Sequence, residues 1–460
     1  MPILKFNKII LSEIQDDEIN KYMMSKIDIK NCLVTYCLSS IFKLSNSNTV
    51  SMNLIERCFP MFADSGNFLE LGFTFIRKIL LSSGLNVDSE LQIFNAVDSW
   101  LCHSITERSK YAKELLSVVR FPLLAIPALK QILDRVLSMY HECASNIEAV
   151  LVKKQQFISF SPNITNRYCK QINFKVLICG GRTCTSFDSK FLTDIKLFDT
   201  NNFSDFINFS SKKEDIEDYF GAVCIKGEVF VFGGIAGETQ TIEKYSSDTN
   251  TWEYVADMID DRVRFSICSF MNNVYIMSGH SAWPEEIRHI YTATCFKFDT
   301  KSLDWKEISR MNNGRIFSAS SVFEGRIIVS GGKLRRITNT VVAYDHVGDT
   351  WENMPNMING RAKHKSVAAK NKFFVIGGFE TSSCEVFDSI TNEFTLLKQP
   401  SLLSVGEIYR PSGVITIGSE IFVFQDNSGV KTYDFENNEW SLKMCEATKG
   451  ISRFTVLKYL

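Results

Sequence analysis

An apolar run that ends in a glycine pair recurs through the carboxyl-terminal half of this 460-residue chain. Two further copies have lost the pair and end in Gly279-His280 and Gln425-Asp426. Short apolar runs rich in β-branched and aromatic residues predict buried strands, and a period of about 45–50 residues is typical of a four-stranded blade. Six copies therefore predict a six-bladed β-propeller over residues 175–460. The complete copies end at Gly180-Gly181, Gly233-Gly234, Gly331-Gly332 and Gly377-Gly378.

A pair of aromatic residues follows each apolar run. In five copies the second aromatic stands seven residues after the first, and in the first copy Phe206 stands eight residues after Phe198. Large rings at repeated positions can fill the space between neighbouring twisted sheets. An aspartate follows most of the first aromatics, and we interpret these acids as turn residues. The five regular pairs are Tyr245/Trp252, Phe298/Trp305, Tyr344/Trp351, Phe387/Phe394 and Tyr433/Trp440.

The order of strands predicts how the ring closes. Copies two to six each have a strand before the apolar run, starting near Tyr219, Arg264, Arg315, Arg361 and Arg410, whereas the residues before the first copy are polar and irregular. The missing strand stands at the other end of the chain, where residues 453–460 resemble residues 264–269. The last residues are therefore expected to complete the first blade, which removes the free edges of an open ring. We expect a chain that lacks residues 453–460 to aggregate or melt early.

The amino-terminal part has a helical pattern. Ser89 and Gln92 have the spacing of a capping box at a helix start. Apolar residues then recur every three or four positions, as one buried helix face requires. A second helix is expected from about Glu107 to Val119, because Phe121 precedes a proline and that position disfavours helix. The apolar stripe consists of Leu91, Phe94, Val97, Trp100 and Leu101.

These patterns resemble a known family. The repeats from residue 175 on resemble kelch repeats, and residues 28–135 resemble a BACK domain in the segments Asn31-Cys32-Leu33, 67–71, 80–90 and 118–124. The resemblance implies an α+β multidomain fold, in which a helical BACK domain precedes an all-β six-bladed kelch propeller. Residues 1–27 resemble the last helix of a BTB domain, whose strand–helix core has no counterpart here, and residues 136–174 are expected to be a linker.

Five arginines are the candidate partner-binding residues. Each precedes or begins a first strand of a blade, so repeat symmetry should bring them to one end of the propeller, near its axis. In kelch-like substrate adaptors such arginines face the bound peptide, and a guanidinium fork suits a carboxylate. The alternative is that they join blades through buried hydrogen bonds. The five are Arg264, Arg315, Arg361, Arg410 and Arg453; Arg262, Lys333, Arg335, Arg336, Lys363 and Lys365 add charge nearby.

Other function classes find little support in the sequence. The net charge is −1, which disfavours a nucleic-acid binder with a broad basic face. The 13 cysteines form no CxxC pair, and the six histidines have no metal-ligand spacing. No apolar run approaches the roughly 20 residues of a membrane span, and the amino terminus lacks the apolar region of a signal peptide. We predict a cytoplasmic binding protein with no catalytic residues, no cofactor and no catalytic metal.

The family resemblance implies specific partners. In kelch-like adaptors the BTB domain dimerises and binds a cullin, the BACK domain helps to hold the cullin, and the propeller presents a substrate protein for ubiquitin transfer. The leading expectation is therefore a substrate-recognition adaptor of a cullin-RING ubiquitin ligase. The alternatives are an actin-binding kelch scaffold and a truncated adaptor that sequesters substrates.

Overall fold

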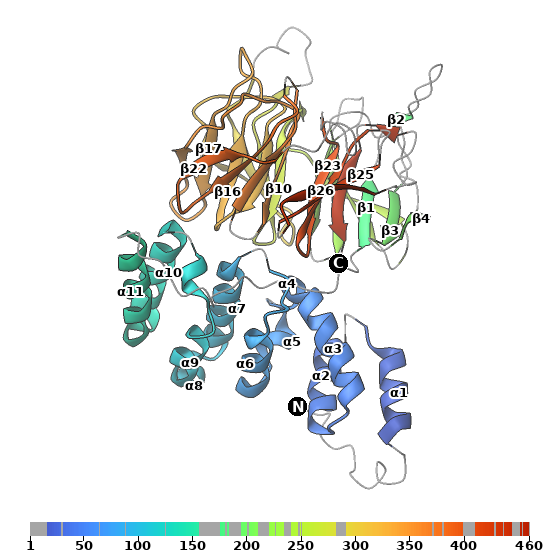
Figure 1. Ribbon diagram of the computed structural model, residues 1–460, viewed down its shortest axis with the longest axis vertical. Helices are drawn as coiled ribbons and strands as arrows, with labels where there is room; N and C mark the ends of the chain where they lie inside the picture. The colour runs from blue at the N-terminus through green and yellow to red at the C-terminus, as the bar shows by residue number, and fades with distance from the viewer. Residues whose placement is uncertain are drawn as a thin grey trace. The chain divides into compact units, whose positions relative to one another are not determined.

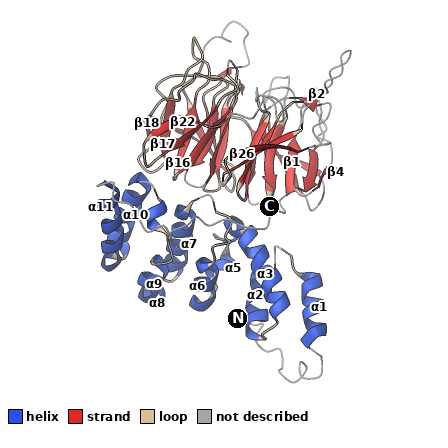
Figure 2. Ribbon diagram, in the orientation of Figure 1, coloured by secondary structure: helices blue, strands red, loops and turns tan. Residues whose placement is uncertain are grey.

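The chain forms two compact units, Met1–Gln171 and Ile172–Leu460. Figures 1 and 2 show a helical first unit and an all-β second unit. The computed structural model describes residues 16–28, 31–63, 65–87, 89–124, 126–155, 175–179, 182–183, 195–199, 202–209, 220–225, 227–233, 241–246, 249, 251–281, 291–369, 372–379, 381–398, 410–426, 429–435, 437–443, 451–452 and 454–459.

The first unit is built around one apolar core. The predicted stripe of α7 lies in this core, and Leu91, Phe94, Val97, Trp100 and Leu101 are all buried. The Trp100 indole also donates to the Leu71 carbonyl at 2.9 Å. Among the described helices, none combines the length and apolar character that crossing a membrane demands. The helices are α1 (Asp16–Lys26), α2 (Cys32–Ile41), α3 (Ser45–Arg57), α4 (Phe59–Phe62), α5 (Gly66–Leu69), α6 (Phe73–Leu81), α7 (Glu90–His103), α8 (Ile105–Arg108), η1 (Ser109–Tyr111), α9 (Ala112–Leu116), η2 (Phe121–Leu123), α10 (Ile126–Met139), η3 (His141–Cys143) and α11 (Ala144–Gln155).

Two local predictions for this unit are wrong. Helix α7 follows Ser89 as predicted, but the Ser89 carbonyl, not its side chain, accepts the Gln92 N–H, so no capping box forms. The single helix predicted from 107 to 119 is instead α8, η1 and α9. At the end of α8 the Arg108 guanidinium donates to the Leu69 and Trp100 carbonyls at 2.8 and 2.9 Å.

The linker prediction also fails over part of its length. Helix α11 and the end of α10 occupy residues that were assigned to the linker at 136–174. Ile147, Val150 and Leu151 of α11 are buried in the helical core. Their apolar side chains stabilise this helix against the rest of the unit, which a solvated linker would not allow.

In the described part of the second unit the strands form six four-stranded antiparallel sheets, which are the six blades. They are β28 (Thr455–Tyr459), β1 (Lys175–Cys179), β3 (Ile195–Asp199), β4 (Asn202–Phe209); β5 (Gly221–Ile225), β6 (Glu228–Phe232), β7 (Thr241–Ser246), β8 (Thr251–Asp257); β10 (Ser266–Phe270), β11 (Asn273–Met277), β13 (Cys295–Asp299), β14 (Trp305–Ile308); β15 (Ala319–Phe323), β16 (Arg326–Ser330), β17 (Val341–Asp345), β18 (Thr350–Met354); β19 (Lys365–Ala369), β20 (Lys372–Ile376), β21 (Cys384–Asp388), β22 (Glu393–Leu396); and β23 (Gly413–Ile417), β24 (Glu420–Phe424), β25 (Val430–Asp434), β26 (Glu439–Lys443). Two small pairs join β9 (Arg262–Val263) to β12 (His280–Ser281), and β2 (Arg182–Thr183) to β27 (Ile451–Ser452).

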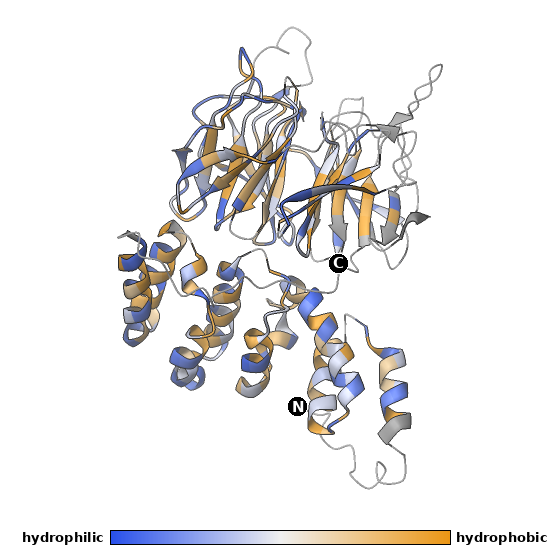
Figure 3. Cartoon of the chain, viewed as in Figure 1, coloured by the Kyte–Doolittle hydropathy of each residue, from blue (hydrophilic) through white to orange (hydrophobic). Residues whose placement is uncertain are grey.

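The ring is closed by the end of the chain. Strand β28 pairs antiparallel with β1, so Ile178 lies opposite Val456, and the last strand is the innermost strand of the first blade. The innermost strands contact one another in the cyclic order β28, β5, β10, β15, β19, β23 and back to β28. An apolar cluster fills each of the six junctions between neighbouring blades, and Figure 3 shows apolar residues along the strands. The ring therefore leaves no inner strand without neighbours on both sides.

The repeated aromatics stand opposite each other across the two outer strands of a blade. Tyr344 pairs with Trp351 in the register of β17 and β18, and their ring centroids are 5.1 Å apart. The tryptophan then bonds to the preceding blade: the Trp351 indole donates to the Ser309 carbonyl at 2.7 Å. The same bond joins Trp305 to Asp257 at 3.1 Å and Trp440 to Lys398 at 2.7 Å. The fixed seven-residue spacing thus encodes a contact within a blade and one between blades.

We predict that a charge placed in the closing strand destabilises the propeller. Val456 of β28 is 7% exposed and lies in the cluster between the first and last blades. Val456→Asp would bury a carboxylate without a partner, at a cost of about 3–5 kcal/mol, so its thermal midpoint should fall well below that of the wild type. Val347→Asp is the matched control because Val347 is 72% exposed. Equal midpoints for the two variants would contradict the closure.

Candidate protein-binding face of the propeller

The glycine pairs allow neighbouring blades to approach closely where the second strand of a blade ends. Gly331 and Gly332 have φ values of +54° and +97°, which side chains rarely adopt. A Cβ on Gly331 would lie 2.5 Å from the carbonyl oxygen of Arg361 in the next blade. In the degenerate third blade Ser278 takes the first position with φ +61°. The repeated glycines therefore mark a point of backbone contact.

Three buried arginines hold the loops at this end of the ring. Arg262, Arg315 and Arg361 are 1%, 2% and 0% exposed. Each Nη1 donates to the carbonyl of the residue sixteen positions later: Ser278 at 3.1 Å, Gly331 at 3.0 Å and Gly377 at 2.8 Å. Two of their own carbonyls accept N–H groups of the preceding blade, because Gly279 donates to Arg315 at 2.9 Å and Gly332 donates to Arg361 at 2.8 Å. These arginines therefore join a loop to its own blade and to its neighbour.

The blades compensate the buried charge differently. Arg361 forms an ion pair with Glu385, and both side chains are fully buried. Arg315 has no such carboxylate among the described residues, and burial lowers its pKa to about 10. In the sixth blade a buried lysine, Lys431, donates to the side chain of Gln425, at the position where the third, fourth and fifth blades offer a main-chain carbonyl. A cation at this point is thus a repeated structural requirement.

A second set of residues lies two positions after these arginines. Arg264, Phe317 and Lys363 have φ values of +57°, +57° and +53°, and Arg410 of the sixth blade has φ +40°. Bulky residues rarely adopt this left-handed conformation, and such outliers gather at functional sites. Backbone hydrogen bonds join three of them in a row, because Phe317 donates to Arg264 at 3.2 Å and Lys363 donates to Phe317 at 2.9 Å. We call these four residues the left-handed turn residues.

The expectation that the candidate arginines occupy one equivalent position is wrong. Arg264 and Arg410 are left-handed turn residues, whereas Arg315 and Arg361 are buried two positions earlier in their loops and correspond to Arg262. The guanidinium groups of this buried pair bond within their own blades, and only the main-chain carbonyls of Arg315 and Arg361 accept hydrogen bonds from the preceding blade. The inner strands begin after the arginines, at Ser266, Ala319, Lys365 and Gly413. Arg453 and Tyr219 lie outside the described residues. The sixteen-residue spacing to the strand end is the sequence signal that separates the two positions.

A cavity opens on the propeller axis between these loops. It has a volume of about 240 Å³, and all six blades contribute to its lining, from Phe220 in the second blade to Phe454 in the first. We call it the axial cavity. Its cations are Arg264, Lys363, Lys365 and Arg410, and Asp426 is the acid that lines it.

The charge of the axial cavity is partly compensated. Asp426 accepts a hydrogen bond from the Ser412 hydroxyl and favours the charged form of Lys365, whose pKa burial lowers. Burial, with Arg361 and Lys365 nearby, holds the pKa of His364 well below its usual range, so this imidazole is neutral at physiological pH. The axial cavity therefore has an excess of positive charge that His364 does not share.

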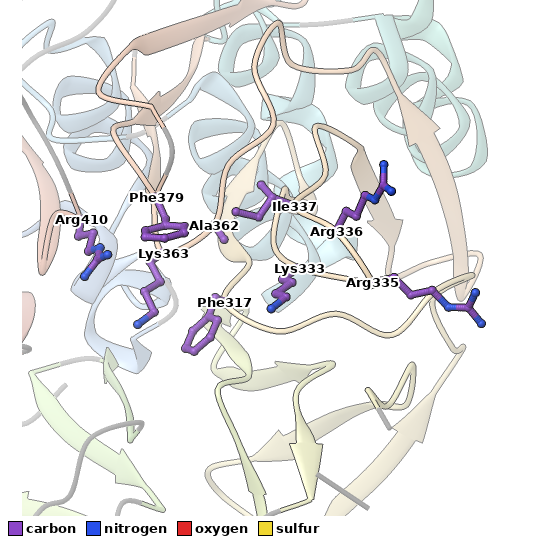
Figure 4. A pocket seen from close by; sticks show the side chains of 9 residues that line it. All are labelled: Phe317, Lys333, Arg335, Arg336, Ile337, Ala362, Lys363, Phe379 and Arg410. Atoms are coloured by element: carbon purple, nitrogen blue, oxygen red, sulfur yellow. The ribbon is translucent and has the colours of Figure 1, made fainter. Parts of the chain in front are cut away.

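A larger cavity adjoins the axial one. Its volume is about 640 Å³, and it shares Phe317, Lys363 and Arg410 with the axial cavity (Figure 4). Its other cations are Lys333, Arg335 and Arg336, and none of its lining residues is acidic. We call it the basic cavity. Of the nearby charges that the sequence singled out, Lys333, Arg335, Arg336 and Lys363 line it, while Arg262 is buried elsewhere and Lys365 lines the axial cavity.

The placement of metal-ligating and thiol side chains is a further feature of the described residues. Within these ranges no three His, Cys, Asp or Glu side chains gather as they would around a metal ion. Burial raises the pKa of Cys179 and Cys268 to about 12, so both thiols stay protonated at neutral pH. The face presents oriented cations beside aromatic rings, and such groups can bind a ligand.

Comparisons with known proteins agree with this arrangement. The BACK (BTB And C-terminal Kelch) family model matches residues 32–134, and the KLHDC2/KLHL20/DRC7 Kelch-repeats domain model matches residues 166–378. Spermatocyte protein spe-26 of Caenorhabditis elegans is 24% identical over 68% of this chain and 50% of its own length. Kelch-like protein 25 of Xenopus tropicalis is 21% identical over 89% of this chain and 63% of its own, and Kelch-like protein 26 of Danio rerio is 21% identical over 94% and 74%.

The fold and the matches together define the class: a helical BACK region followed by a six-bladed kelch propeller. The chain is similar to proteins named Kelch-like, and its two halves match a BACK model and a kelch-repeat model. It spans half of the spe-26 protein and 63% of Kelch-like protein 25.

We predict a large loss of stability at one arginine of this face and almost none at another. Arg361→Ala would leave the Glu385 carboxylate buried without its partner, which typically costs about 3–5 kcal/mol, so the thermal midpoint should fall steeply. Arg410 is exposed, and Arg410→Ala should change stability by no more than about 0.5 kcal/mol. Thermal unfolding of both variants measures this, and a stable Arg361→Ala protein would refute the anchoring role.

Proposed function

We propose that this chain is a substrate-recognition adaptor of a cullin-RING ubiquitin ligase and that its propeller binds the substrate protein. The observation that carries the proposal is the cluster of left-handed turn residues around the axial and basic cavities. Loops held by buried arginines present these side chains at one end of a rigid ring. Such preorganised side chains bind a partner at little entropic cost.

The electrostatics of the face support a protein partner with an acidic segment. Arg264 and Arg410 belong to different blades, and both line the axial cavity. The Arg264 guanidinium lies 5.1 Å from the Phe317 ring centroid, and that of Arg410 lies 4.6 Å from the Phe379 centroid. Local charge of one sign focuses a field even in a chain whose net charge is −1. In the proposed function Arg264 and Arg410 contact the substrate, and Arg315 and Arg361 support the loops. Arg453, the fifth arginine expected from the sequence, would be a further contact.

The adaptor role adds a scaffold to this capture. The BACK region would help to hold a cullin, as the family resemblance implies, and the chain would contribute positioning without bond-making residues of its own. A kelch scaffold on filamentous actin and an adaptor that sequesters substrates without ubiquitin transfer are the competing functions.

The capture step is tested with three forms of the full chain. Wild type, the Arg264→Ala/Arg410→Ala double variant and Arg310→Ala are immobilised and incubated with the same cell extract. Arg310 is the control because its side chain is exposed, pairs with Glu307 and lines neither cavity. A charge-assisted contact contributes about 1.5–3 kcal/mol. Proteins retained by wild type and Arg310→Ala should therefore bind the double variant at least roughly tenfold more weakly. Retention that is equal in all three forms would refute the site.

The scaffold step is tested with purified partners. The full chain is mixed with the amino-terminal domain of a cullin and, separately, sedimented with filamentous actin. Binding of the cullin alone supports the adaptor. Sedimentation with actin and no cullin binding would replace it with the cytoskeletal function, and substrate capture with neither partner would favour sequestration.

A further inference from the structure

The basic cavity differs from the axial cavity in its charge balance. Five cationic side chains line it, and none of its lining residues is acidic. Lys333, Arg335, Arg336 and Arg410 form no ion pair with any residue that the structure describes. By contrast, Asp426 compensates the charge of the axial cavity. An anion therefore meets its strongest attraction in the basic cavity.

A short hairpin between β16 and β17 fixes one wall of this cavity. Lys333 pairs with Ile316 on one side and Ile337 on the other, and Leu334 donates its N–H to the Arg336 carbonyl at 3.0 Å. Lys333, Arg335 and Arg336 are exposed on this hairpin. In Figure 4 the Lys333 and Lys363 side chains end on the side of Phe317, whereas Arg335 extends away from them. The hairpin thus directs Lys333 toward the cavity, and its two arginines form a charged rim.

Aromatic rings position the cations of the opposite wall. The Lys363 ammonium lies 4.5 Å from the Phe317 ring centroid, and the Arg410 guanidinium lies 4.6 Å from that of Phe379. Attraction between a cation and a ring face helps to hold each group in place. The Lys363 backbone is fixed as well, since its N–H donates to the Phe317 carbonyl. These positive charges are ordered before any ligand arrives.

We propose that the basic cavity binds a phosphorylated serine or threonine side chain of the captured protein. This inference rests on the proposed function, because it assigns a subsite of the same face. A carboxylate carries one negative charge and is satisfied by a single guanidinium fork, whereas a phosphoryl group carries about −1.5 to −2 at pH 7 and offers three acceptor oxygens. Lys333, Lys363 and Arg410 supply three cations from three blades around one space.

The apolar part of the lining defines what flanks the phosphate. Ile337, Ala362 and Phe379 line the same cavity. The volume of about 640 Å³ exceeds what a phosphoryl group alone fills and lies in the range of small-ligand pockets. The ligand is therefore a phosphorylated residue next to an apolar one, and not an isolated acidic side chain.

The test uses peptide libraries with a fixed central residue and random flanks. The full-length protein is incubated with a phosphoserine library, a glutamate library and a serine library, and the retained peptides are quantified. We expect at least tenfold stronger retention of phosphoserine peptides than of glutamate peptides, with apolar residues selected beside the phosphoserine. Equal retention of the glutamate library overturns the proposal, as does preferential binding of free tripolyphosphate or of an oligonucleotide.

Matched variants locate the phosphate. Lys333→Ala/Arg410→Ala should abolish the preference for phosphoserine, whereas Lys333→Arg and Arg310→Ala should keep it. Thermal midpoints of all variants are measured alongside, and Lys333→Arg retains a cation without removing side-chain volume. A phosphoserine preference that survives in Lys333→Ala/Arg410→Ala overturns the site.

One further arm separates this inference from the proposed function. The cell extract used for the capture experiment is divided, and one half is treated with a protein phosphatase. We expect the treatment to remove the proteins that depend on Arg264 and Arg410. If those proteins are retained equally from both halves, substrate capture stands and the phosphate site falls. If phosphoserine peptides bind but no protein depends on the two arginines, the phosphate site stands and the proposed capture falls.

Discussion

The protein-binding face of the propeller depends on one hydrogen bond in each of three loops. A buried arginine donates this bond to the carbonyl at the end of the second strand of its own blade. Arg262, Arg315 and Arg361 make this bond in three successive blades. The backbone at two of these arginines also accepts an N–H from the blade before. The bond therefore couples the position of each loop to two blades at once. The left-handed turn residue two positions later is therefore held in place by the same loop.

Positive charge in this propeller serves two separate purposes. Buried guanidinium groups form hydrogen bonds inside a blade, and that of Arg361 is also paired with Glu385, a pair that contributes to the fold only while both partners remain. Exposed charge around the basic cavity lies beside aromatic rings, which orient the Lys363 and Arg410 side chains. The sixth blade shows the division in another form, because Lys431 serves the buried role while Asp426 reduces the charge of the axial cavity.

The degenerate copies of the repeat keep the geometry by other means. Ser278 adopts the left-handed conformation that glycine adopts elsewhere, and its hydroxyl accepts the Arg315 N–H at 2.6 Å. The sixth blade lacks the glycine pair, and its Gln425 side chain accepts the hydrogen bond of a buried lysine. A hydrogen-bonded cation at the end of the second strand thus recurs although the residues that provide it change. This explains why a ring with imperfect repeats still closes.

The propeller, its six blades and the closing strand could all be predicted from the sequence, because they follow from contacts between positions that repeat along the chain. The spacing of Tyr344 and Trp351 encodes a cross-strand pair, and the similarity of residues 453–460 to an inner strand encodes its place beside β1. The apolar stripe of α7 could be predicted as well, because its apolar residues also recur at a regular spacing. The tertiary structure shows which arginines line a cavity, because the sixteen-residue spacing can be interpreted only once the end of the second strand is known. Arg264 and Arg315 look alike in sequence, yet one is a left-handed turn residue of the axial cavity and the other donates to Gly331 inside its blade. A difference of two positions in equivalent loops decides whether an arginine side chain is exposed or buried. This difference depends on the backbone conformation of the loop and on the carbonyls of strands that are distant in sequence. The basic cavity was likewise beyond reach from sequence, because its cations come from three blades and only the closed ring brings them together.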